Sequence, residues 1–469
     1  MKNMTKSKGY NFHDSILRAY DIRGIFGQTL AAKDAYFLGK SFVKFCSELN
    51  KKKKKLKIVI GYDGRKSSLK LSEALIKGLM ESGVNVINMG LCPTPMLYFG
   101  VKYFESDAGI MITGSHNPPE YNGFKLLLKD RPIFGDDIQK IGQIAKEGEF
   151  LNASGNVREE NIKLEYIKRI TKDFKPGRKL KVAWDCGNGV TGVVMPMLAN
   201  YLPTVDSLLL YEHVDANFPN HHPDPTIEEN LEDLKKAVIR NKCDVGFAFD
   251  GDGDRIGVVD SKGEVIWGDQ LMMLYAEEIL SKYPGATIIS EVKASQHLFD
   301  RIEELGGNPI MFRTGHSYIK AKMKEVKALF AGEMSGHMFF ADIYDGFDDG
   351  LYAAIRVLNI IGNKDKKLYE FRKSLPKSFA TPELRIEVDD DKKFEIVEEI
   401  KHRLKELHTD LNDIDGVRVN TEQGWFLIRA SNTQPILIAR CEADNKNDLK
   451  ILKENLRDQL KLSGIEFKC

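Results

Sequence analysis

One pattern occurs three times in this chain, and this repetition limits the possible folds more than any other feature. The segments KIVIGYDGR, LKVAWDCGN and ATIISEVKA are short runs rich in β-branched residues that end at charged turns, which is typical of buried strands. Each is followed by an amphipathic segment with helical spacing (LSEALIKGLMESG, VTGVVMPMLANYL and QHLFDRIEELGG) and a second strand-like run (VNVINMG, VDSLLLYEH and NPIMFRTGH). Three divergent copies of one βαβ unit are the simplest account.

Each copy continues with a third apolar strand that runs into a polar loop. These segments are GIMITGSHNP, VGFAFDGDGDR and ALFAGEMSGH. Because ligands of open α/β sheets gather at the carboxyl ends of strands, we expect the three loops to face one shared cleft.

The pattern changes after LPKSFATPE, near residue 380. The rest reads as strand (LRIEV), helix (FEIVEEIKHRLKEL) and three further strands (VRVNT, GWFLIRA and PILIARCEA), which predicts a separate α+β domain. The helix is expected to pack on its sheet through one face that carries Phe394, Val397, Ile400, Leu404 and Leu407.

Composition excludes several classes of protein. The 469 residues allow about three domains, and 69 basic against 68 acidic residues give no reason to expect nucleic acid or membrane partners. We interpret the KKKKK run at 51–55 as a solvated loop. Six cysteines without a CxxC pair argue against disulfides and a zinc ribbon. With neither a secretory signal nor a membrane-length apolar run, we expect a cytoplasmic protein.

The loop DGDGDR predicts a metal site. Asp250, Asp252 and Asp254 alternate with glycines, so the backbone can turn tightly and aim three carboxylates at one point. An all-oxygen cluster suits Mg²⁺ or Ca²⁺ rather than zinc. An EF-hand is excluded because Arg255 stands at its glycine position and Ser261 at its terminal glutamate position. In a bare surface turn the three carboxylates would repel one another without relief.

The loop CGNGVTG offers a different interpretation. Gly187, Gly189 and Gly192 match the dinucleotide fingerprint GxGxxG, and Glu212 follows about twenty residues later. A glycine-rich turn between a strand and a helix is also what close packing in any βαβ unit selects. An NAD-binding oxidoreductase therefore stays open as an alternative.

The histidine pair in NFPNHHPDP is interpreted as part of a proline-rich loop. A zinc site at His221 and His222 would need cysteine or further histidine at ligand spacing, and the sequence has neither.

Ser115 in TGSHNPP is either a nucleophile or a turn residue. The hydrolase motif GxSxG is absent, and adjacent side chains of an extended chain point opposite ways, which disfavours His116 as a base for the serine. The loop GWFLIRASNTQP suits a phosphate, because a guanidinium binds phosphate bidentately and small polar groups take the remaining oxygens; it offers Arg429, Ser431, Asn432 and Thr433. A metal site, a serine and a phosphate clamp together indicate phosphoryl transfer.

These loops resemble those of the α-D-phosphohexomutase family, in the family's order and through nearly the whole chain. TGSHNP is similar to the phosphoserine loop, DGDGDR to the metal loop, GEMSGH to the sugar loop and RASNTQP to the phosphate loop. The resemblance implies three similar α/β domains, each a mixed sheet with flanking helices, and a C-terminal α+β domain with a TATA-binding-protein-like fold around a central cleft. The expected boundaries are 1–158, 159–264, 265–376 and 377–469.

The resemblance also implies an activity, which is the reversible transfer of a phosphoryl group between the 1- and 6-positions of hexose phosphates. Ser115 would carry the phosphoryl group, and Mg²⁺ would be held by Ser115 and the three aspartates. A hexose 1,6-bisphosphate would be the intermediate and activator. It would turn over inside the cleft between the two transfers.

Further roles are implied residue by residue. Arg23, Lys125 and His337 would be catalytic, with the direction of acid and base roles open, and His116 stays unassigned. Glu333 and Ser335 would bind the sugar's 3- and 4-hydroxyls, which glucose and mannose share. The substrate-binding residues implied are Tyr20, Arg255, Lys293, His316, Glu333, Ser335, His337, Arg429, Ser431, Asn432 and Thr433.

The sequence of the sugar loop limits which hexose phosphates are expected as substrates. With methionine at position 334, the loop GEMSGH is similar to that of the bifunctional phosphomannomutase/phosphoglucomutase branch of the family. Members that act on glucosamine phosphate commonly carry glutamine at this position. A phosphoglucosamine mutase and a metal-dependent sugar phosphatase stay open as alternatives. The oligomeric state is not indicated, and a monomer is compatible with the sequence.

Overall fold

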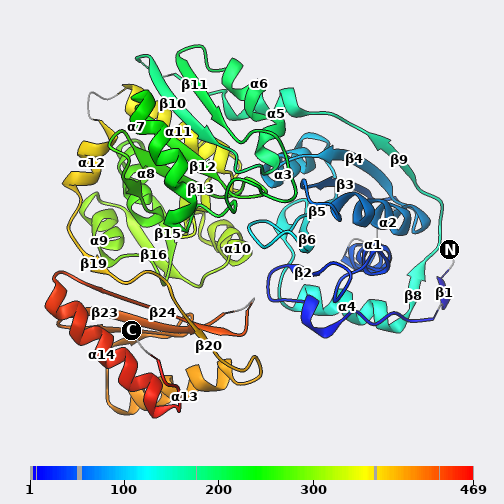
Figure 1. Ribbon diagram of the computed structural model, residues 1–469. Coiled ribbons are helices and arrows are strands. Elements are labelled where there is room, and N and C mark those ends of the chain that lie inside the picture. Colours follow the sequence, from blue (N-terminus) through cyan, green and yellow to red (C-terminus); the bar gives the residue numbers. More distant parts are fainter. Residues whose placement is uncertain are drawn as a thin grey trace.

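The computed structural model describes residues 4–6, 8–49, 55–175, 177–363, 367–431 and 434–467. Residues 51–54 of the lysine run, and the predicted phosphate ligands Asn432 and Thr433, lie outside the described residues. Figure 1 shows the chain as successive α/β units, with the first on one side, the second and third beside each other, and the C-terminal unit below them.

The three predicted repeats share one sheet topology. Each sheet contains three parallel strands in the order second, first, third, and an antiparallel fourth strand follows the third. The strands are β3 (Lys57–Tyr62), β4 (Asn85–Leu91), β5 (Ala108–Ile112) and β6 (Tyr121–Leu128); β10 (Leu180–Asp185), β11 (Val205–Leu210), β12 (Val245–Phe249) and β13 (Ile256–Asp260); and β15 (Thr287–Glu291), β16 (Asn308–Phe312), β17 (Phe330–Gly332) and β18 (Met338–Phe340). The repeat predicted from the sequence is confirmed.

Short strands extend two of these sheets. The first gains β2 (Ile22–Ile25), β7 (Arg131–Pro132) and β9 (Asn156–Glu159), and the second gains β14 (Val265–Ile266). A separate two-stranded ribbon pairs β1 (Met4–Lys6) with β8 (Glu149–Leu151).

Helices pack against the sheets because the apolar faces of the sheets must be buried from solvent. In the first unit these are α1 (Ala32–Leu49), α2 (Ser68–Glu81), α3 (Thr94–Tyr103) and α4 (Asp136–Glu147). The second has α5 (Lys163–Ile170), α6 (Met195–Asn200) and α7 (Glu232–Asn241). The third has α8 (Gly268–Lys282), α9 (Gln296–Glu304), α10 (His316–Val326), α11 (Gly350–Asn363) and α12 (Leu368–Ser374). Short 3₁₀ turns occupy η1 (Asp14–Ile16), η2 (Val190–Val193) and η3 (Glu228–Leu231).

The segment VTGVVMPMLANYL differs from the single helix that its spacing predicted. It forms the 3₁₀ turn η2 and then the short helix α6, with Pro196 in the first turn of α6. Proline has no backbone N–H and favours the first turn of a helix, so α6 begins here instead of continuing from the glycine-rich loop.

The C-terminal unit is the predicted α+β domain. Its sheet has the order β19 (Phe379–Ala380), β24 (Ile436–Ala443), β23 (Gly424–Ala430), β22 (Val417–Thr421) and β21 (Leu411–Asn412), and β20 (Leu384–Glu387) also pairs with β24. The helices α13 (Lys393–Glu406) and α14 (Lys446–Leu462) contribute to its core.

The predicted apolar face of α13 is wrong at its two ends. Val397, Ile400 and Leu404 are buried, but Phe394 is 53% exposed and Leu407 is 67% exposed. Phe394 lies in the first turn of the helix and Leu407 follows its last residue. Only the central turns of a helix this short lie over the sheet, so the periodic pattern is longer than the contact.

The cores show how the units are joined. One apolar cluster runs through the first three units and includes Val59, Trp184 and Tyr275, whereas the C-terminal unit has a cluster of its own. No helix in the described part of the chain has both the length and the apolar character needed to cross a membrane. The four residue boundaries expected from the sequence remain a prediction.

Candidate active site

Ser115 lies in the loop after β5 and has an uncommon backbone conformation. Its φ is +50°, in the left-handed region, and the residue is 2% exposed. The Ser115 N–H donates to the Thr113 hydroxyl over 2.7 Å, and the Ser115 hydroxyl donates to Asp250 Oδ2 over 2.8 Å. A buried hydroxyl is therefore aimed from the first unit at the aspartate loop of the second.

Arg65 holds this loop through its backbone. Its Nη2 donates to Ser115 O over 2.8 Å and to Asn117 O over 2.6 Å, while Nη1 donates to Pro118 O and to Tyr121 O. The remaining N–H, on Nε, donates to Asp63 over 3.1 Å. All five guanidinium donors are thus used.

Asp63 completes this support. Its Oδ2 accepts from the Thr113 hydroxyl over 2.8 Å and from Gly114 N–H over 3.0 Å. Sequence reasoning missed both residues, although they stand in the repeat YDGR directly after β3. Their position could have indicated a role in the site, because they follow the carboxyl end of β3, the strand that pairs with β5.

The three aspartates of DGDGDR converge, as predicted. Asp250, Asp252 and Asp254 are fully buried, and oxygens of all three lie within 4.8 Å of one another. Lys125, from β6, reaches across from the first unit and donates to Asp252 Oδ2 over 2.7 Å and to Asp254 Oδ2. Ser115, Lys125 and the aspartates therefore form one cluster between two units.

The cluster carries more negative charge than its lysine balances. Despite burial, the three aspartates raise the pKa of Lys125 above its usual value, so it is a cation. Burial, with Asp252 and Asp254, raises the pKa of Asp250 well above its usual range. Asp252 Oδ1 is buried and accepts no hydrogen bond from the described residues. A divalent cation with oxygen ligands would relieve both features, so the residues present fit Mg²⁺.

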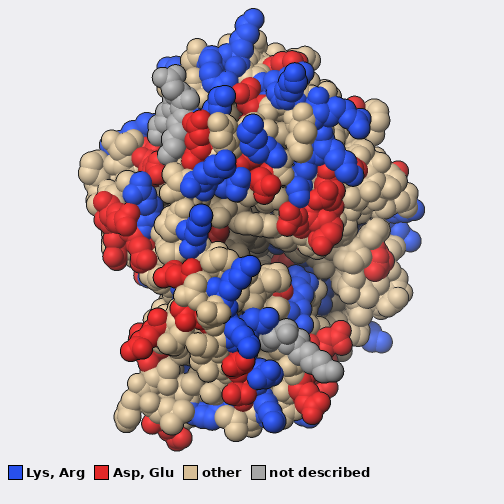
Figure 2. Space-filling model, turned by 60° about the vertical axis from the view of Figure 1, so that its left-hand side comes forward, with Lys and Arg blue, Asp and Glu red and all other residues tan. Residues whose placement is uncertain are grey.

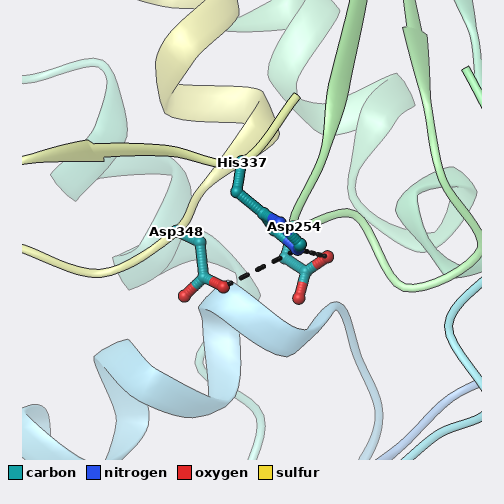
Figure 3. A group of neighbouring side chains, drawn as sticks. All are labelled: Asp254, His337 and Asp348. Carbon is teal, nitrogen blue, oxygen red and sulfur yellow. Dashed lines mark ion pairs between the residues drawn. The ribbon is translucent and has the colours of Figure 1, made fainter. Parts of the chain in front are cut away.

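Histidine 337 connects the metal loop to the sugar loop. Its Nδ1 donates to Glu333 Oε2 over 2.9 Å, and its Nε2 lies 3.2 Å from Asp254 Oδ1 and 4.0 Å from Asp348 Oδ2. Figure 3 shows the His337, Asp254 and Asp348 side chains directed toward one another from three segments. These three groups also lie close enough to share an ion.

The carboxylates around His337 control its charge. Despite burial, which opposes protonation, Asp254 and Glu333 raise the pKa of His337 to about 9. Despite burial, His337 in turn lowers the pKa of Glu333 to about 2. Ser335 Oγ lies 3.1 Å from His337 Nδ1, and Arg255 Nε lies 3.3 Å from His337 Nε2.

His316, at the start of α10, stands beside this group. Its ring stacks on His337 at 5.5 Å between ring centres, and its Nδ1 lies 3.3 Å from Asp348 Oδ2. The Tyr20 ring packs edge-on against His316 at 5.9 Å. Sequence reasoning missed Asp348, which no motif marked; only the fold places it between the two histidines.

Arg23, for which the resemblance implied a catalytic role, lies next to the loop that carries Ser115. Its Nη1 donates to Asn117 Oδ1 and its Nη2 donates to Asp21 Oδ2 over 2.5 Å. The strand β2 that carries Arg23 pairs with β6, which carries Lys125. The two cations are therefore set by neighbouring strands.

The phosphate loop follows β23 in the C-terminal unit. Arg429 Nε donates to Asp415 Oδ2 over 3.0 Å, and the same oxygen accepts from Thr314 N–H over 2.9 Å, two residues before His316. Ser431 is buried and its Oγ accepts from Gln434 N–H over 3.2 Å. Figure 2 shows a hollow between this lower lobe and the rest of the molecule, with Lys and Arg side chains near it.

Lys293 also faces the C-terminal unit. Its ammonium donates to Glu383 Oε2 over 3.0 Å and lies 3.9 Å from Glu291 Oε1. Despite burial, these two carboxylates raise its pKa. Lys293 is a buried cation at the junction between the third and the last unit.

The expectation that His116 points away from Ser115 is wrong. Its Nδ1 lies 3.1 Å from Ser115 Oγ. The argument assumed an extended chain, but the left-handed φ of Ser115 brings the two side chains to the same side. Burial, Arg255 and Arg23 lower the pKa of His116 well below its usual range, so this histidine is neutral.

The histidine pair has separate contacts, in a loop without regular secondary structure. His221 Nε2 lies 2.9 Å from Asp185 Oδ2, while His222 Nε2 donates to His116 O. His222 thus supports the Ser115 loop from the second unit, a contact that the sequence did not suggest.

The glycines of CGNGVTG have packing roles. A Cβ at Gly192 would lie 1.8 Å from Glu212 O, and one at Gly189 would lie 3.0 Å from Gly251 O, in the aspartate loop. Gly187 has a φ of +52°. Backbone approach and turn geometry account for all three, without a nucleotide.

Comparison with known proteins decides the family. Four models of the phosphoglucomutase/phosphomannomutase family match the chain in order: α/β/α domain I at 14–152, domain II at 164–263, domain III at 267–379 and the C-terminal domain at 383–459. The chain belongs to this family. In the family's terms, Ser115 and Lys125 lie in domain I, the aspartates in domain II, the sugar loop in domain III and Arg429 in the C-terminal domain, domain IV.

Individual members are similar over almost their whole length. A phosphomannomutase/phosphoglucomutase of Pseudomonas aeruginosa is 42% identical over 458 residues, 98% of each chain. A phosphoglucomutase of Neisseria gonorrhoeae is 43% identical over 446 residues, 94% of this chain and 96% of that one. The crystal structure of a phosphoglucomutase/phosphomannomutase family protein from Burkholderia thailandensis has a TM-score of 0.87 at 39% identity and covers 96% of this chain and 98% of that one.

Proposed function

We propose that this chain is a phosphomannomutase/phosphoglucomutase that moves a phosphoryl group between the 1- and 6-positions of mannose and glucose phosphates. The observation that carries the proposal is the 2.8 Å contact between the buried Ser115 hydroxyl and Asp250, at the meeting point of two domains. The relative from Pseudomonas aeruginosa carries the same pair of activities in its name. The expected cytoplasmic location is supported by Cys46, Cys92, Cys186 and Cys243, which are buried and form no disulfide among the described residues.

The reaction consists of two phosphoryl transfers. The sugar's free hydroxyl oxygen attacks the phosphorus of phospho-Ser115, the bond from phosphorus to Oγ breaks, and the hydroxyl proton passes to a base. The product is a hexose 1,6-bisphosphate, which also serves as activator because it phosphorylates free Ser115. After the bisphosphate turns over, its other phosphate returns to Ser115 and the isomeric monophosphate leaves.

Asp250, Asp252 and Asp254, together with Ser115, would hold Mg²⁺. Bound there, the ion would neutralise charge on the phosphoryl group. Because the aspartates are fully buried, Mg²⁺ should stabilise the folded protein by linkage. We expect Mg²⁺ to raise the unfolding temperature of the wild type and not that of Asp252→Asn; an equal rise in both would place the ion elsewhere.

We assign proton transfer to His337 and charge stabilisation to Lys125. His337 is held protonated between Asp254 and Glu333, which suits a proton donor to the departing sugar oxygen. Lys125 is a permanent cation in the same cluster of aspartates that the Ser115 hydroxyl contacts, where it would stabilise the charge of the transferring group. Arg23, beside the same loop, adds a second cation.

The remaining predicted residues would bind the sugar phosphate. The Glu333 carboxylate would accept hydrogen bonds from the sugar's 3- and 4-hydroxyls, and the Ser335 hydroxyl would donate to them. The substrate's own phosphate would bind to the loop that follows β23 in the C-terminal domain. The residues proposed for phosphate and cleft contacts are Tyr20, Arg255, Lys293, His316, Arg429, Ser431, Asn432 and Thr433.

Specificity and reaction type can be tested in one assay. We expect kcat/KM for mannose 1-phosphate and glucose 1-phosphate within about tenfold of each other, since the contacts proposed for GEMSGH are to the 3- and 4-hydroxyls that both sugars share. We expect a lower value for glucosamine 1-phosphate. Isomerised sugar phosphate should far exceed free phosphate. Free phosphate as the main product would instead indicate a phosphatase, and preference for the glucosamine ester a phosphoglucosamine mutase.

The NAD alternative has a direct test. The packing roles of Gly187, Gly189 and Gly192 predict no binding of NAD at millimolar concentration. Saturable binding would revive the oxidoreductase interpretation.

A further inference from the structure

Most residues that line a cavity between domains I and III have no part in the mechanism above. Its volume is about 590 Å³, within the range of about 300–1,000 Å³ that is typical of small-molecule sites. Its walls come from β6, β7 and α3 on one side and from α10 and the segments around β18 on the other. Tyr20, Lys125 and His316 form the end nearest the active site.

The lining is strongly basic. Seven basic residues line the cavity against two acidic ones, Asp130 and Asp345, in a protein whose net charge is +1. The basic residues are Lys102, Lys125, Lys129, Arg131, Lys320, Lys324 and Lys327. Carboxylates outside the lining balance three of these five excess charges, which leaves two unpaired cations to attract an anion.

Two of these cations are available to a ligand. Lys102 pairs with Asp345, and Lys324 lies 3.5 Å from Asp130, so both of these lysines are in interdomain ion pairs. Arg131, Lys320 and Lys125 are likewise paired. Lys129 and Lys327 are exposed and form no ion pair within the described part of the chain.

The interior of the cavity is apolar. Val101, Leu126, Met323 and Phe347 are each at most 7% exposed and contribute to its wall. A small inorganic anion would leave this surface in contact with water. The combination of an apolar wall and a basic rim matches an organic anion with a hydrophobic body.

The cavity is connected to the active site through two elements. Strand β6 runs from the cavity to Lys125, and helix α10 begins at His316. One turn along α10, Lys320 donates to Asp348 over 2.7 Å and lies 3.3 Å from the Tyr98 hydroxyl of α3. A ligand in the cavity therefore contacts both the strand that carries Lys125 and the helix that begins at His316.

We propose that this cavity is an effector site for an amphipathic organic anion, a molecule with an aromatic or aliphatic body and one carboxylate, sulfonate or phosphate. Its acidic group pairs with Lys129 and Lys327, and its body fills the space between β6 and α10. Because the occupant fixes domain I against domain III, it slows the turnover of the bisphosphate. Only this last effect rests on the proposed function.

Binding is tested with two probes that share one apolar skeleton. These are the anion 1-anilinonaphthalene-8-sulfonate and the neutral N-phenyl-1-naphthylamine, followed by fluorescence titration of the full chain. We expect one saturable site for the anion. Lys129→Glu/Lys327→Glu should weaken the anion about tenfold and leave the neutral probe unchanged. Leu128 also lines the cavity, so Leu128→Trp should fill part of it and weaken the binding of both probes.

A matched control separates local from global charge. Lys179→Glu/Lys461→Glu changes two exposed lysines outside the cavity lining and should leave both probes unaffected. The proposal is overturned if the two double variants weaken the anion equally, if Leu128→Trp has no effect, or if glucose 1-phosphate displaces the anion competitively.

The effect on catalysis is a separate measurement. Saturating anionic probe should lower kcat several-fold with little change in KM for glucose 1-phosphate, and the Lys129→Glu/Lys327→Glu variant should need about tenfold more probe. Unchanged turnover with the site filled would refute the effector role. A chain that binds the probe at this site but isomerises no sugar phosphate would instead refute the proposed function and leave the site intact.

Discussion

At the scale of single residues, the backbone around Ser115 matters as much as its hydroxyl. A left-handed conformation costs a non-glycine residue about 1–2 kcal/mol, and Ser115 adopts it within a loop whose carbonyls accept from Arg65. The Asp63 carboxylate orients this guanidinium by accepting from its Nε–H. The hydroxyl therefore faces Asp250 because Arg65 and Asp63 hold the backbone of its loop.

This support predicts the behaviour of Arg65→Lys. An ammonium cannot donate to four carbonyls in one plane, so Ser115 should shift within its loop. Since a displacement of about 1 Å can cost about 10²-fold in rate, we expect kcat to fall by that order with KM little changed. Steady-state kinetics checks this, and Lys66→Arg is the matched control because Lys66 is exposed and, among the described residues, its ammonium donates to Asn217 alone. Equal activity of the two variants would contradict the role of Arg65.

Some residue-scale features could be predicted from the sequence and others could not. The aspartates, Ser115 and Lys125 lie in motifs with a chemical reason to be together. Asp348 lies in no motif, and only the fold places it beside the two histidines His316 and His337. His116 was misplaced because the rule for extended chains does not hold at a left-handed residue.

At the scale of elements, Asp349 caps α11 and ties it to α5. Its carboxylate accepts from Tyr352 N–H over 2.9 Å and from the Tyr166 and Tyr344 hydroxyls. Burial nevertheless raises the pKa of Asp349 to about 6. The folded protein therefore favours the protonated acid more strongly than the unfolded chain does.

This predicts how stability depends on pH. With its pKa raised on folding, Asp349 contributes stability that is present below about pH 4 and lost as the pH rises through 6, on the order of 3 kcal/mol. Asp349→Asn does not titrate. Relative to this variant, the wild type should lose unfolding free energy between pH 4 and pH 6, as measured by urea denaturation, and a constant difference over that range would contradict the assignment.

The helix α13 allows a second test at this scale. Ile400 is fully buried in the domain IV core, whereas Leu407 is 67% exposed. Ile400→Ala should cost about 2–5 kcal/mol of unfolding free energy, and Leu407→Ala should change it by less than about 0.5 kcal/mol. Denaturant unfolding of both variants measures these losses of unfolding free energy. A loss in Leu407→Ala comparable to that in Ile400→Ala would support the longer apolar face that the sequence predicted.

The order of elements was largely predictable, because strand and helix periodicities repeat three times. Their ends were less so. Periodicity says which residues are apolar, but a helix buries only the turns that lie over its sheet, as the exposed Phe394 and Leu407 show. Pro196 divided one predicted helix for a local reason that the periodicity did not weigh.

At the scale of the whole molecule, the site exists only where domains meet. Lys125 and Asp254 are 129 residues apart in sequence, and Ser115 and Asp250 are 135 apart. The repeat indicated that equivalent loops share a cleft, which is how their meeting could be anticipated. The contacts that link domain IV to the histidines, such as Asp415 with Thr314, have no sequence signal and depend on the docking of whole domains.

The central claim is that Ser115 carries the phosphoryl group. Intact mass spectrometry after incubation with glucose 1,6-bisphosphate tests it most directly, with peptide mapping to locate the adduct. We expect one phosphoryl group on Ser115 of the wild type, its loss when glucose 1-phosphate is added in excess, and no adduct on a folded Ser115→Ala variant, which should also be inactive. A phosphoryl group at another residue, or full isomerisation by Ser115→Ala, would contradict the account.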